Sequence, residues 1–403
     1  MYPSLFREPS DLFSSRRRFF KFLAASPLAA SIPLLRSQDQ IALATPKDAL
    51  NVLDFEPAAR KALPPAHFGY MATGVDDDAT LRANREGFRK YQLRPRRMVD
   101  VSHADLSVDV LGTKWATPLF ICPCGSQKAF HPDGEMATAA AANTRKTVQV
   151  LSTMSTTPIE DVARANGKPI WYQLYLTSSW SVTEKLVAHA EEAGCPVLAV
   201  TVDLTVGRNT ETLERAKRAD TRQCTNCHPG GPQRSYGRYS MFKGIEMNGI
   251  TTYNSAMSWD MVSRLKKFTK MKIVLKGIET REDARLSREN GADAIIVSNH
   301  GGRAEESGRG TIECLPEVID GAGSMPVLID GGFRRGTDIY KALALGARAV
   351  GIGRPYLWGL AAFGQPGVER VLDLLHAELE LTMKQLGRRT IAEIDRSSII
   401  PAA

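Results

Sequence analysis

The sequence has no uninterrupted apolar run long enough to cross a membrane. Its most apolar N-terminal stretch, Phe19 to Leu35, is short and is broken by Lys21, Pro27 and Pro33. It also has little charge imbalance outside two segments. Of the net charge of +8, residues 1–44 contribute +3 and residues 207–243 contribute +5. The remaining chain is balanced, which argues against a broad nucleic-acid-binding face and indicates one local basic loop.

A Gly-rich first turn, typical of open dinucleotide-binding sheets, is also missing. Disorder is not indicated, because 43% of the 403 residues are hydrophobic and 24% are charged, as in ordinary globular proteins. A chain of this length can form two average domains or one large α/β barrel.

From Pro118 onward, short apolar runs alternate with amphipathic helical patterns. The runs are Leu119–Cys122, Val148–Leu151, Ile170–Leu174, Val197–Val202, Ile273–Leu275, Ala294–Val297, Val327–Ile329 and Ala349–Ile352. The helical patterns include Glu135–Asn143, Ser181–Ala193, Trp259–Phe268, Arg281–Asn290 and Thr337–Leu345. Eight strands alternating with helices predict an α/β fold, a (β/α)8 TIM barrel over residues 45–403. A helical extension should precede the barrel, and a long lid insertion over residues 207–258 should follow the fourth strand.

The run Ala294–Val297 leads into Ser298-Asn299-His300-Gly301-Gly302-Arg303. A buried parallel strand that ends in a polar, glycine-containing turn is typical of an active site. His300 can accept a proton near neutral pH, and the Arg303 fork can bind a carboxylate. The simpler alternative is a helix cap or surface turn with an incidental histidine.

The other strand ends decide between these alternatives, because the C-terminal ends of barrel strands face one site. They carry Pro123-Cys124-Gly125, Ser152, Gln173 with Tyr175, Thr201 with Asp203, Lys276, Asp330-Gly331-Gly332 and Gly353-Arg354. Glycines and arginines after the last two strands indicate a phosphate site.

These motifs resemble the FMN-dependent L-2-hydroxy-acid oxidase and dehydrogenase family, over about residues 50 to 400. The resemblance rests on residues 298–303, on Leu328 to Gly336, on Lys341 to Ala347 and on Ile352 to Pro355. It implies FMN as cofactor, a small L-2-hydroxy acid as substrate and a homotetramer.

The resemblance also implies a role for each site residue. His300 would be the base and Asp203 its partner, while Tyr70 and Arg303 would bind the substrate carboxylate and Tyr175 its hydroxyl. Lys276 would stabilise the reduced flavin. The remaining cofactor contacts would come from Pro123, Cys124, Gly125, Ser152, Gln173, Thr201, Ser298, Asp330, Gly332, Arg334, Gly353 and Arg354.

Three places depart from the family pattern. Ala304-Glu305-Glu306 stands where many relatives have Gln-Leu-Asp, and Arg208 lies one or two positions early for a second substrate-facing arginine. Cys224-Thr225-Asn226-Cys227-His228, inside the basic insertion, matches the attachment motif of c-type haem. A disulfide and half of a zinc site are the alternatives, so the motif leaves three interpretations open. Cys122, Cys124, Cys195 and Cys314 are expected to be small buried residues of the barrel.

Residues 1–44 are expected to form an export signal and linker. Arg16-Arg17-Arg18-Phe19-Phe20-Lys21, followed by an apolar stretch, resembles the bacterial twin-arginine signal, so we expect a periplasmic protein. With the basic insertion and the haem-like motif, export favours a dehydrogenase of a lactate-like or mandelate-like acid that passes electrons to a cytochrome or quinone. An oxygen-using oxidase that makes hydrogen peroxide is the alternative, followed by a non-catalytic flavin electron-relay protein.

Overall fold

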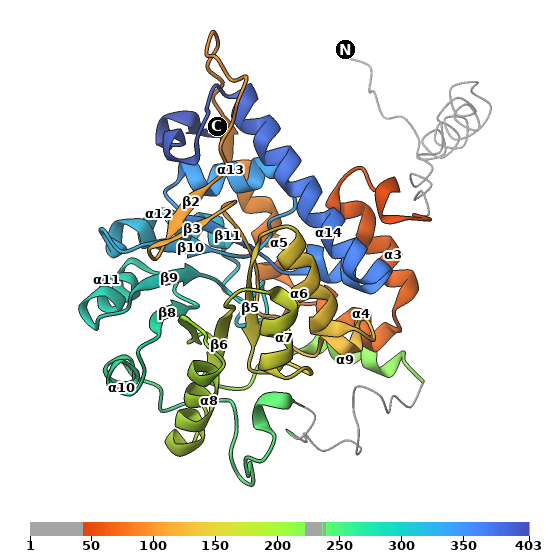
Figure 1. The fold of residues 1–403 in the computed structure, drawn as a ribbon, viewed down its shortest axis with the longest axis vertical. Coiled ribbons are helices and arrows are strands. Elements are labelled where there is room, and N and C mark those ends of the chain that lie inside the picture. Colours follow the sequence, from red (N-terminus) through yellow and green to blue (C-terminus); the bar gives the residue numbers. More distant parts are fainter. Residues whose placement is uncertain (1–42, 222–235, 237–238, 403) are drawn as a thin grey trace, which may run out of the picture. The chain divides into compact units, whose positions relative to one another are not determined.

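The structure is a computed structural model that describes residues 43–221, 236 and 239–402. Eight parallel strands close into a barrel in the order β10-β11-β4-β5-β6-β7-β8-β9, which confirms the predicted TIM barrel (Figure 1). The strands are β4 (Leu119–Ile121), β5 (Val148–Ser152), β6 (Trp171–Tyr175), β7 (Val197–Thr201), β8 (Lys272–Lys276), β9 (Ala294–Val297), β10 (Val327–Ile329) and β11 (Ala349–Ile352). Each predicted apolar run overlaps one of them, with bounds that differ by at most one residue.

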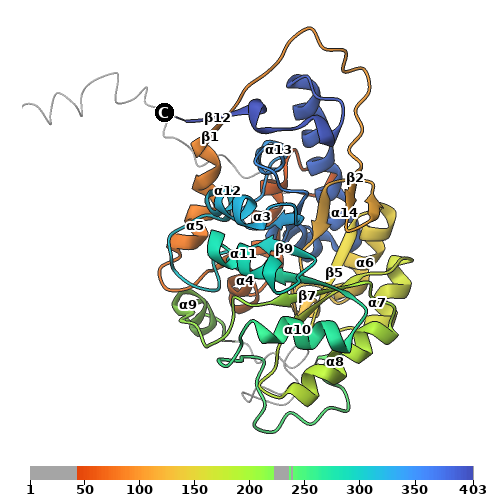
Figure 2. The ribbon, with the colours of Figure 1, turned by 90° about the vertical axis from the view of Figure 1, so that its left-hand side faces the viewer.

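Helices surround the strands on the outside (Figures 1 and 2). They are α6 (Gly134–Thr144), α7 (Ile159–Asn166), α8 (Trp180–Glu192), α10 (Asp260–Phe268), α11 (Arg281–Glu289), α12 (Thr311–Ala322), α13 (Gly336–Ala344) and α14 (Arg354–Gln385). Helices α7, α12 and α14 lie outside the helical patterns named above. The eight-residue length of α7 and Pro316 inside α12 weaken their sequence signals.

The barrel strands are buried on both faces, because helices cover one side and the barrel interior the other. All residues of β4, β7, β9, β10 and β11 are buried, and many are β-branched. This burial explains why the strands read as continuous apolar runs and not as alternating ones.

The N-terminal extension consists of α3 (Phe55–Ala62), α4 (Pro65–Ala72) and α5 (Ala79–Glu86), followed by two small sheets. The hairpin of β2 (Val108–Val110) and β3 (Thr113–Trp115) packs on the barrel through Trp115, whose ring centroid lies 5.3 Å from that of Trp171. Strand β1 (Tyr91–Leu93) pairs with β12 (Ile399–Pro401), so this extension is joined to the C-terminal segment.

The insertion after β7 begins with α9 (Glu211–Arg218), which packs against α4. The contact is close, because a Cβ atom built on Gly69 of α4 would lie 2.5 Å from the Cβ of Ala216. Tyr239, Met241 and Phe242 at the far end of the insertion are buried. The described parts of the insertion are therefore integrated into the barrel domain.

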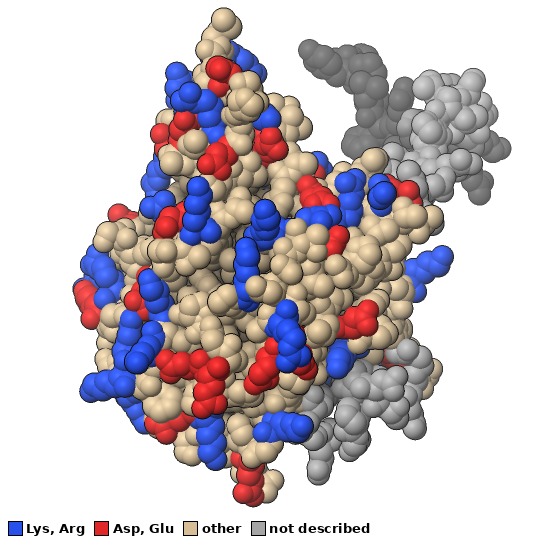
Figure 3. Space-filling view, in the orientation of Figure 1, with Lys and Arg blue, Asp and Glu red and all other residues tan. Residues whose placement is uncertain are grey.

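Two predicted features lie outside the described residues: the export signal within residues 1–42 and the Cys224–Cys227–His228 motif. Both stay predictions. Within residues 43–221, 236 and 239–402, no helix is long and apolar enough to span a membrane. The molecular face drawn in Figure 3 carries lysine and arginine side chains interspersed with aspartate and glutamate.

Candidate active site

The loop after β9 carries His300 in a left-handed backbone conformation, with φ of 58°. Such values are uncommon for residues other than glycine and occur where surrounding structure enforces them. Gly302 follows with φ of 75°, and a Cβ there would lie 2.5 Å from the backbone of Leu81 in α5. Only glycine therefore lets α5 pack against this turn, and the turn directs His300 toward the barrel axis.

His300 is held between two side chains from other strands. Its Nδ1 lies 3.0 Å from Oδ1 of Asp203, which follows β7, and its Nε2 lies 3.3 Å from the hydroxyl of Tyr175, at the end of β6. The Asp203 carboxylate accepts a hydrogen bond from Nδ1–H, which leaves Nε2 unprotonated and able to receive a proton. A proton acceptor beside a tyrosine hydroxyl suits removal of a proton from an alcohol or its α-carbon.

Burial and charge set the protonation of this pair. Burial lowers the pKa of His300 below its ordinary value, although Asp203 opposes this shift. Burial alone would raise the pKa of Asp203, but His300 and Lys276 hold it below its ordinary value. At neutral pH the resting site therefore holds a neutral imidazole and an ionised carboxylate, as a general base requires.

We expect kcat/KM to rise with pH and to level off once His300 is neutral. Because burial lowers its pKa, the midpoint of this acid limb should lie below 6.5, the ordinary histidine value. Asp203→Asn should move the midpoint to still lower pH, since Asp203 raises the pKa of His300. A pH profile of kcat/KM measures both midpoints. A wild-type midpoint above 6.5 would contradict the assignment of His300 as the base.

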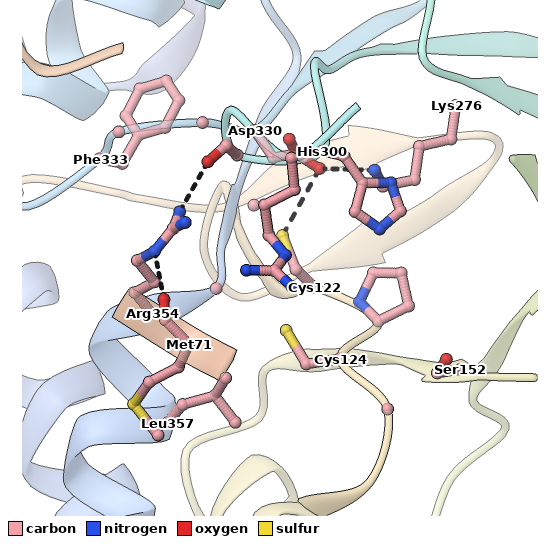
Figure 4. Close-up of a pocket in the computed structure, with 18 of the residues that line it drawn as sticks. Met71, Cys122, Cys124, Ser152, Lys276, His300, Asp330, Phe333, Arg354 and Leu357 are labelled. Carbon is pink, nitrogen blue, oxygen red and sulfur yellow. Dashed lines mark hydrogen bonds and ion pairs between the residues drawn. The ribbon is translucent and has the colours of Figure 1, made fainter. Parts of the chain in front are cut away.

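Lys276, at the end of β8, joins a buried polar network next to His300 (Figure 4). Its Nζ donates to the Ser298 hydroxyl at 2.7 Å and lies 3.4 Å from Oδ2 of Asp330. Ser298 in turn donates to Oδ1 of Asp330 at 2.6 Å. Burial lowers the pKa of Lys276, but Asp330 and Asp203 outweigh it and raise this pKa above its ordinary value. The network keeps a permanent positive charge at the cavity wall.

Arg303 forms a second positive wall of the same cavity. Its Nη1 donates to the backbone oxygens of Tyr70 at 2.6 Å and of Thr73 at 2.7 Å, and its guanidinium lies 4.8 Å from the Tyr70 ring centroid. Its Nη2 is buried and has no hydrogen-bond partner in the structure. A buried donor of this kind is costly unless a ligand accepts from it, and a carboxylate is the preferred acceptor.

Two further arginines, Arg334 and Arg354, line the end of the cavity next to the C-terminal ends of β10 and β11. Burial and the neighbouring Arg354 lower the pKa of Arg334 to about 9, and burial and Arg303 lower the pKa of Arg354 to about 10. Gly332, with φ of 82°, lies so close to Asn84 that a Cβ would come within 2.0 Å of the Asn84 backbone oxygen. Two buried arginines beside a glycine turn at the ends of the last two strands would bind an anion such as a phosphate.

The structure brings most of the predicted site residues into one cavity. Its lining includes Tyr70, Pro123, Cys124, Gly125, Ser152, Tyr175, Lys276, His300, Arg303, Asp330, Gly332, Arg334, Gly353 and Arg354. Asp203 and Ser298 do not line it, but they contact His300 and Lys276, which do. Gln173 and Thr201 do not line it either. They lie buried behind Ser152: the Ser152 hydroxyl donates to Gln173 Oε1 at 3.2 Å, and Gln173 Nε2 donates to the Thr201 hydroxyl at 2.9 Å. In this structure they support a residue that lines the cavity, and their contact with the cofactor stays a prediction.

Sequence reasoning missed the residues that join the catalytic loop to α5. Asn84 exchanges hydrogen bonds with Asn299 at 2.8 and 3.1 Å, and Glu306 accepts from the backbone of Thr80 at 3.0 Å at the N-terminus of α5. Arg208 donates to the Arg303 backbone oxygen at 2.8 Å. The unusual acidic pair after Ala304 offered the one signal, since a carboxylate suits a helix N-terminus.

Comparison with known proteins agrees with this geometry. The model of the family described as FMN-dependent dehydrogenase matches residues 59–401. Glycolate oxidase 3 from Oryza sativa subsp. indica is 40% identical over 358 residues, which cover 87% of this chain and 96% of that protein. Glycolate oxidase 1 from Zea mays is also 40% identical over 358 residues, with coverages of 87% and 95%.

Solved structures show the same fold. A soluble mutant of the membrane-associated (S)-mandelate dehydrogenase from Pseudomonas putida matches with a TM-score of 0.77 and 34% identity, covering 87% of this chain and 99% of that one. A variant of flavocytochrome b2 matches with a TM-score of 0.78 and 30% identity, covering 89% and 88%.

The residues present fit FMN. Arg334, Arg354 and the turn at Gly332 would hold its phosphate. Asp330, which lines the cavity and accepts a hydrogen bond from Ser298, would contact the chain between phosphate and ring. Lys276 would stand beside the ring, where its positive charge favours the reduced, anionic form. When bound, FMN accepts the two electrons of the substrate, while His300 receives a proton at Nε2. The chain therefore belongs to the FMN-dependent dehydrogenase family and is an FMN-dependent enzyme that oxidises L-2-hydroxy acids.

Proposed function

We propose that this enzyme is a dehydrogenase of a lactate-like or mandelate-like L-2-hydroxy acid that passes electrons to a cytochrome or a quinone. The observation that carries the choice of acceptor is the basic insertion, which begins at the active site. Arg208 near its start donates to the backbone of Arg303, while residues 207–243 carry a net charge of +5. A basic segment whose start contacts the catalytic loop favours encounter with an acidic electron carrier.

The cavity walls support the choice of substrate. Arg303 Nη2 can donate a hydrogen bond to the substrate carboxylate, and His300 and Tyr175 lie together to receive the hydroxyl end. Met154 lines the same cavity beside Gly125 and provides an adaptable apolar wall for a methyl or phenyl side chain. A small apolar 2-hydroxy acid therefore suits the site.

The proposed export and assembly rest on the sequence. The twin-arginine-like segment supports a periplasmic location, and the family resemblance supports a homotetramer. Cys224, Cys227 and His228 support a c-type haem, which would relay electrons, while a disulfide or a metal site stays an alternative. A pyridine haemochrome spectrum of protein purified from the periplasm tests the haem: a haem band supports it, and a spectrum without one removes it.

An oxygen-using oxidase is the second candidate, because glycolate oxidases are among the relatives at 40% identity. To separate the two, the flavin is reduced under argon with L-lactate or L-mandelate and then mixed with air, cytochrome c or a short-chain quinone. We expect reoxidation by cytochrome c or quinone to be faster than by air. Fastest reoxidation by air, with one hydrogen peroxide per flavin, would establish the oxidase instead.

A further inference from the structure

A second cavity lies outside the barrel, between β7, β8 and the helices α10 and α11. Its volume is about 230 Å³, and mainly apolar side chains line it. They include Val202, Met257, Trp259, Val262 and Leu265. Figures 1 and 2 show α10 at the periphery of the barrel, outside β8.

The cavity lies directly behind the catalytic residues. Val202 lines it, and the next residue, Asp203, binds His300. Gly277 lines it as well, and the preceding residue, Lys276, lines the FMN cavity. Val202 donates its backbone N–H to the Lys276 backbone oxygen at 2.9 Å. The hydrogen-bonded ends of β7 and β8 thus form a single layer between the two cavities.

Its size and walls define the ligand. A cavity of about 150 Å³ lined by aliphatic and aromatic side chains holds one benzene molecule, so this larger space accommodates one substituted six-membered ring. Trp259 offers an aromatic face, Met257 and Met261 offer adaptable thioethers, and the Thr205 hydroxyl can donate to a carbonyl oxygen. Val202 and Trp259 are only partly buried, so the cavity opens to the surface.

We propose that this cavity binds the ring of a quinone, which accepts electrons from the reduced cofactor across the β7 and β8 strand ends. The proposal rests on the proposed function, and it names the acceptor class and its site. In each turnover the 2-hydroxy acid would lose two electrons and two protons. The reduced cofactor would pass the two electrons to the quinone and return to its oxidised form, and the quinone would become a quinol by taking two protons from water at the open side of the cavity. These two protons balance the two that the acid releases to water through His300 and the cofactor.

Val262→Phe tests the site, because Val262 lies on α10 and lines the cavity, so that a phenylalanine ring there would fill part of it. The matched control is Ser263→Phe, which places the same ring on the exposed outer surface of that helix. Leu265→Phe is a second cavity variant in case the first does not fold. Far-ultraviolet circular dichroism and bound FMN confirm folding of each variant.

Binding is measured with the holoenzyme and decylubiquinone as the probe. We expect the quinone to quench Trp259 fluorescence, a signal that Trp259→Phe removes. The cavity variants should weaken quinone binding by about tenfold or more, because the introduced phenylalanine ring and the quinone ring would occupy the same space. Ser263→Phe should bind the quinone as the wild type does. Stopped-flow reoxidation by the quinone should slow in parallel, with flavin reduction by the acid unchanged.

Unchanged quinone affinity in both folded cavity variants would overturn the proposal. Displacement of the quinone by the 2-hydroxy acid would overturn it too, since it would place the quinone in the FMN cavity. If no 2-hydroxy acid reduces the flavin, the proposed function fails, but the fluorescence titration still reports on the cavity.

Discussion

His300→Ala should retain FMN, but the rate at which L-lactate or L-mandelate reduces the flavin should fall by about 10²- to 10⁴-fold. This is the usual contribution of a positioned general base. The histidine contacts Asp203 and Tyr175, whereas the arginines that would hold the phosphate lie at β10 and β11. The chemical step should therefore fail without loss of the cofactor. Anaerobic stopped-flow measurement of flavin bleaching gives the rate, and the visible flavin spectrum of the purified variant gives occupancy.

The matched control for this variant is His189→Ala. His189 lies on α8 and pairs with Glu160 at 2.6 Å, away from the cavity. Its loss should leave flavin bleaching unchanged. Normal bleaching in His300→Ala would exclude it as the base, and loss of FMN would show instead that the turn after β9 is needed to bind the cofactor.

Arg303→Met should lower kcat/KM for a 2-hydroxy acid by about 10²-fold or more. Each hydrogen bond to a charged group contributes about 1.5–3 kcal/mol, and here the positive charge of a buried guanidinium is lost as well. Its unpartnered Nη2 is the group that would receive the carboxylate. Steady-state kinetics with an artificial acceptor measures the effect.

Two comparisons separate carboxylate binding from structural damage. Arg303→Lys keeps the charge but loses the planar fork, so its kcat/KM should fall between those of the wild type and Arg303→Met. The uncharged 2-hydroxyamide of the same acid has no carboxylate, and its oxidation should change little in Arg303→Met. An equal loss for acid and amide would show that Arg303 mainly holds Tyr70 and Thr73 in place.

The burial of His300 and Arg303 links these two predictions. In a cavity shielded from water, a neutral base and a carboxylate-binding arginine both act more strongly than at the surface. Asn84 and Glu306 hold this loop on α5, so changes in the N-terminal extension should also reach the active site. The insertion contacts the same loop through Arg208.

The barrel and the chemistry at its strand ends follow from the sequence. Parallel strands covered on both faces must be apolar throughout, so runs such as Ala294–Val297 are visible without a structure. Polar residues just after those runs must meet at one end of a closed barrel. That rule predicts from the sequence that His300, Lys276 and Asp330 lie together.

Which of these groups contact each other depends on how distant parts of the chain pack. Asp203 and His300 are 97 positions apart, and Arg303 and Tyr70 are 233 positions apart, so nothing local in the sequence specifies their geometry. Barrel closure and the packing of α5 set the distances. They also place Gln173 and Thr201 behind Ser152, and they leave the apolar cavity under α10. The physical reason is that hydrophobic periodicity reports which face of an element is buried, whereas the partner of each side chain depends on how distant elements pack.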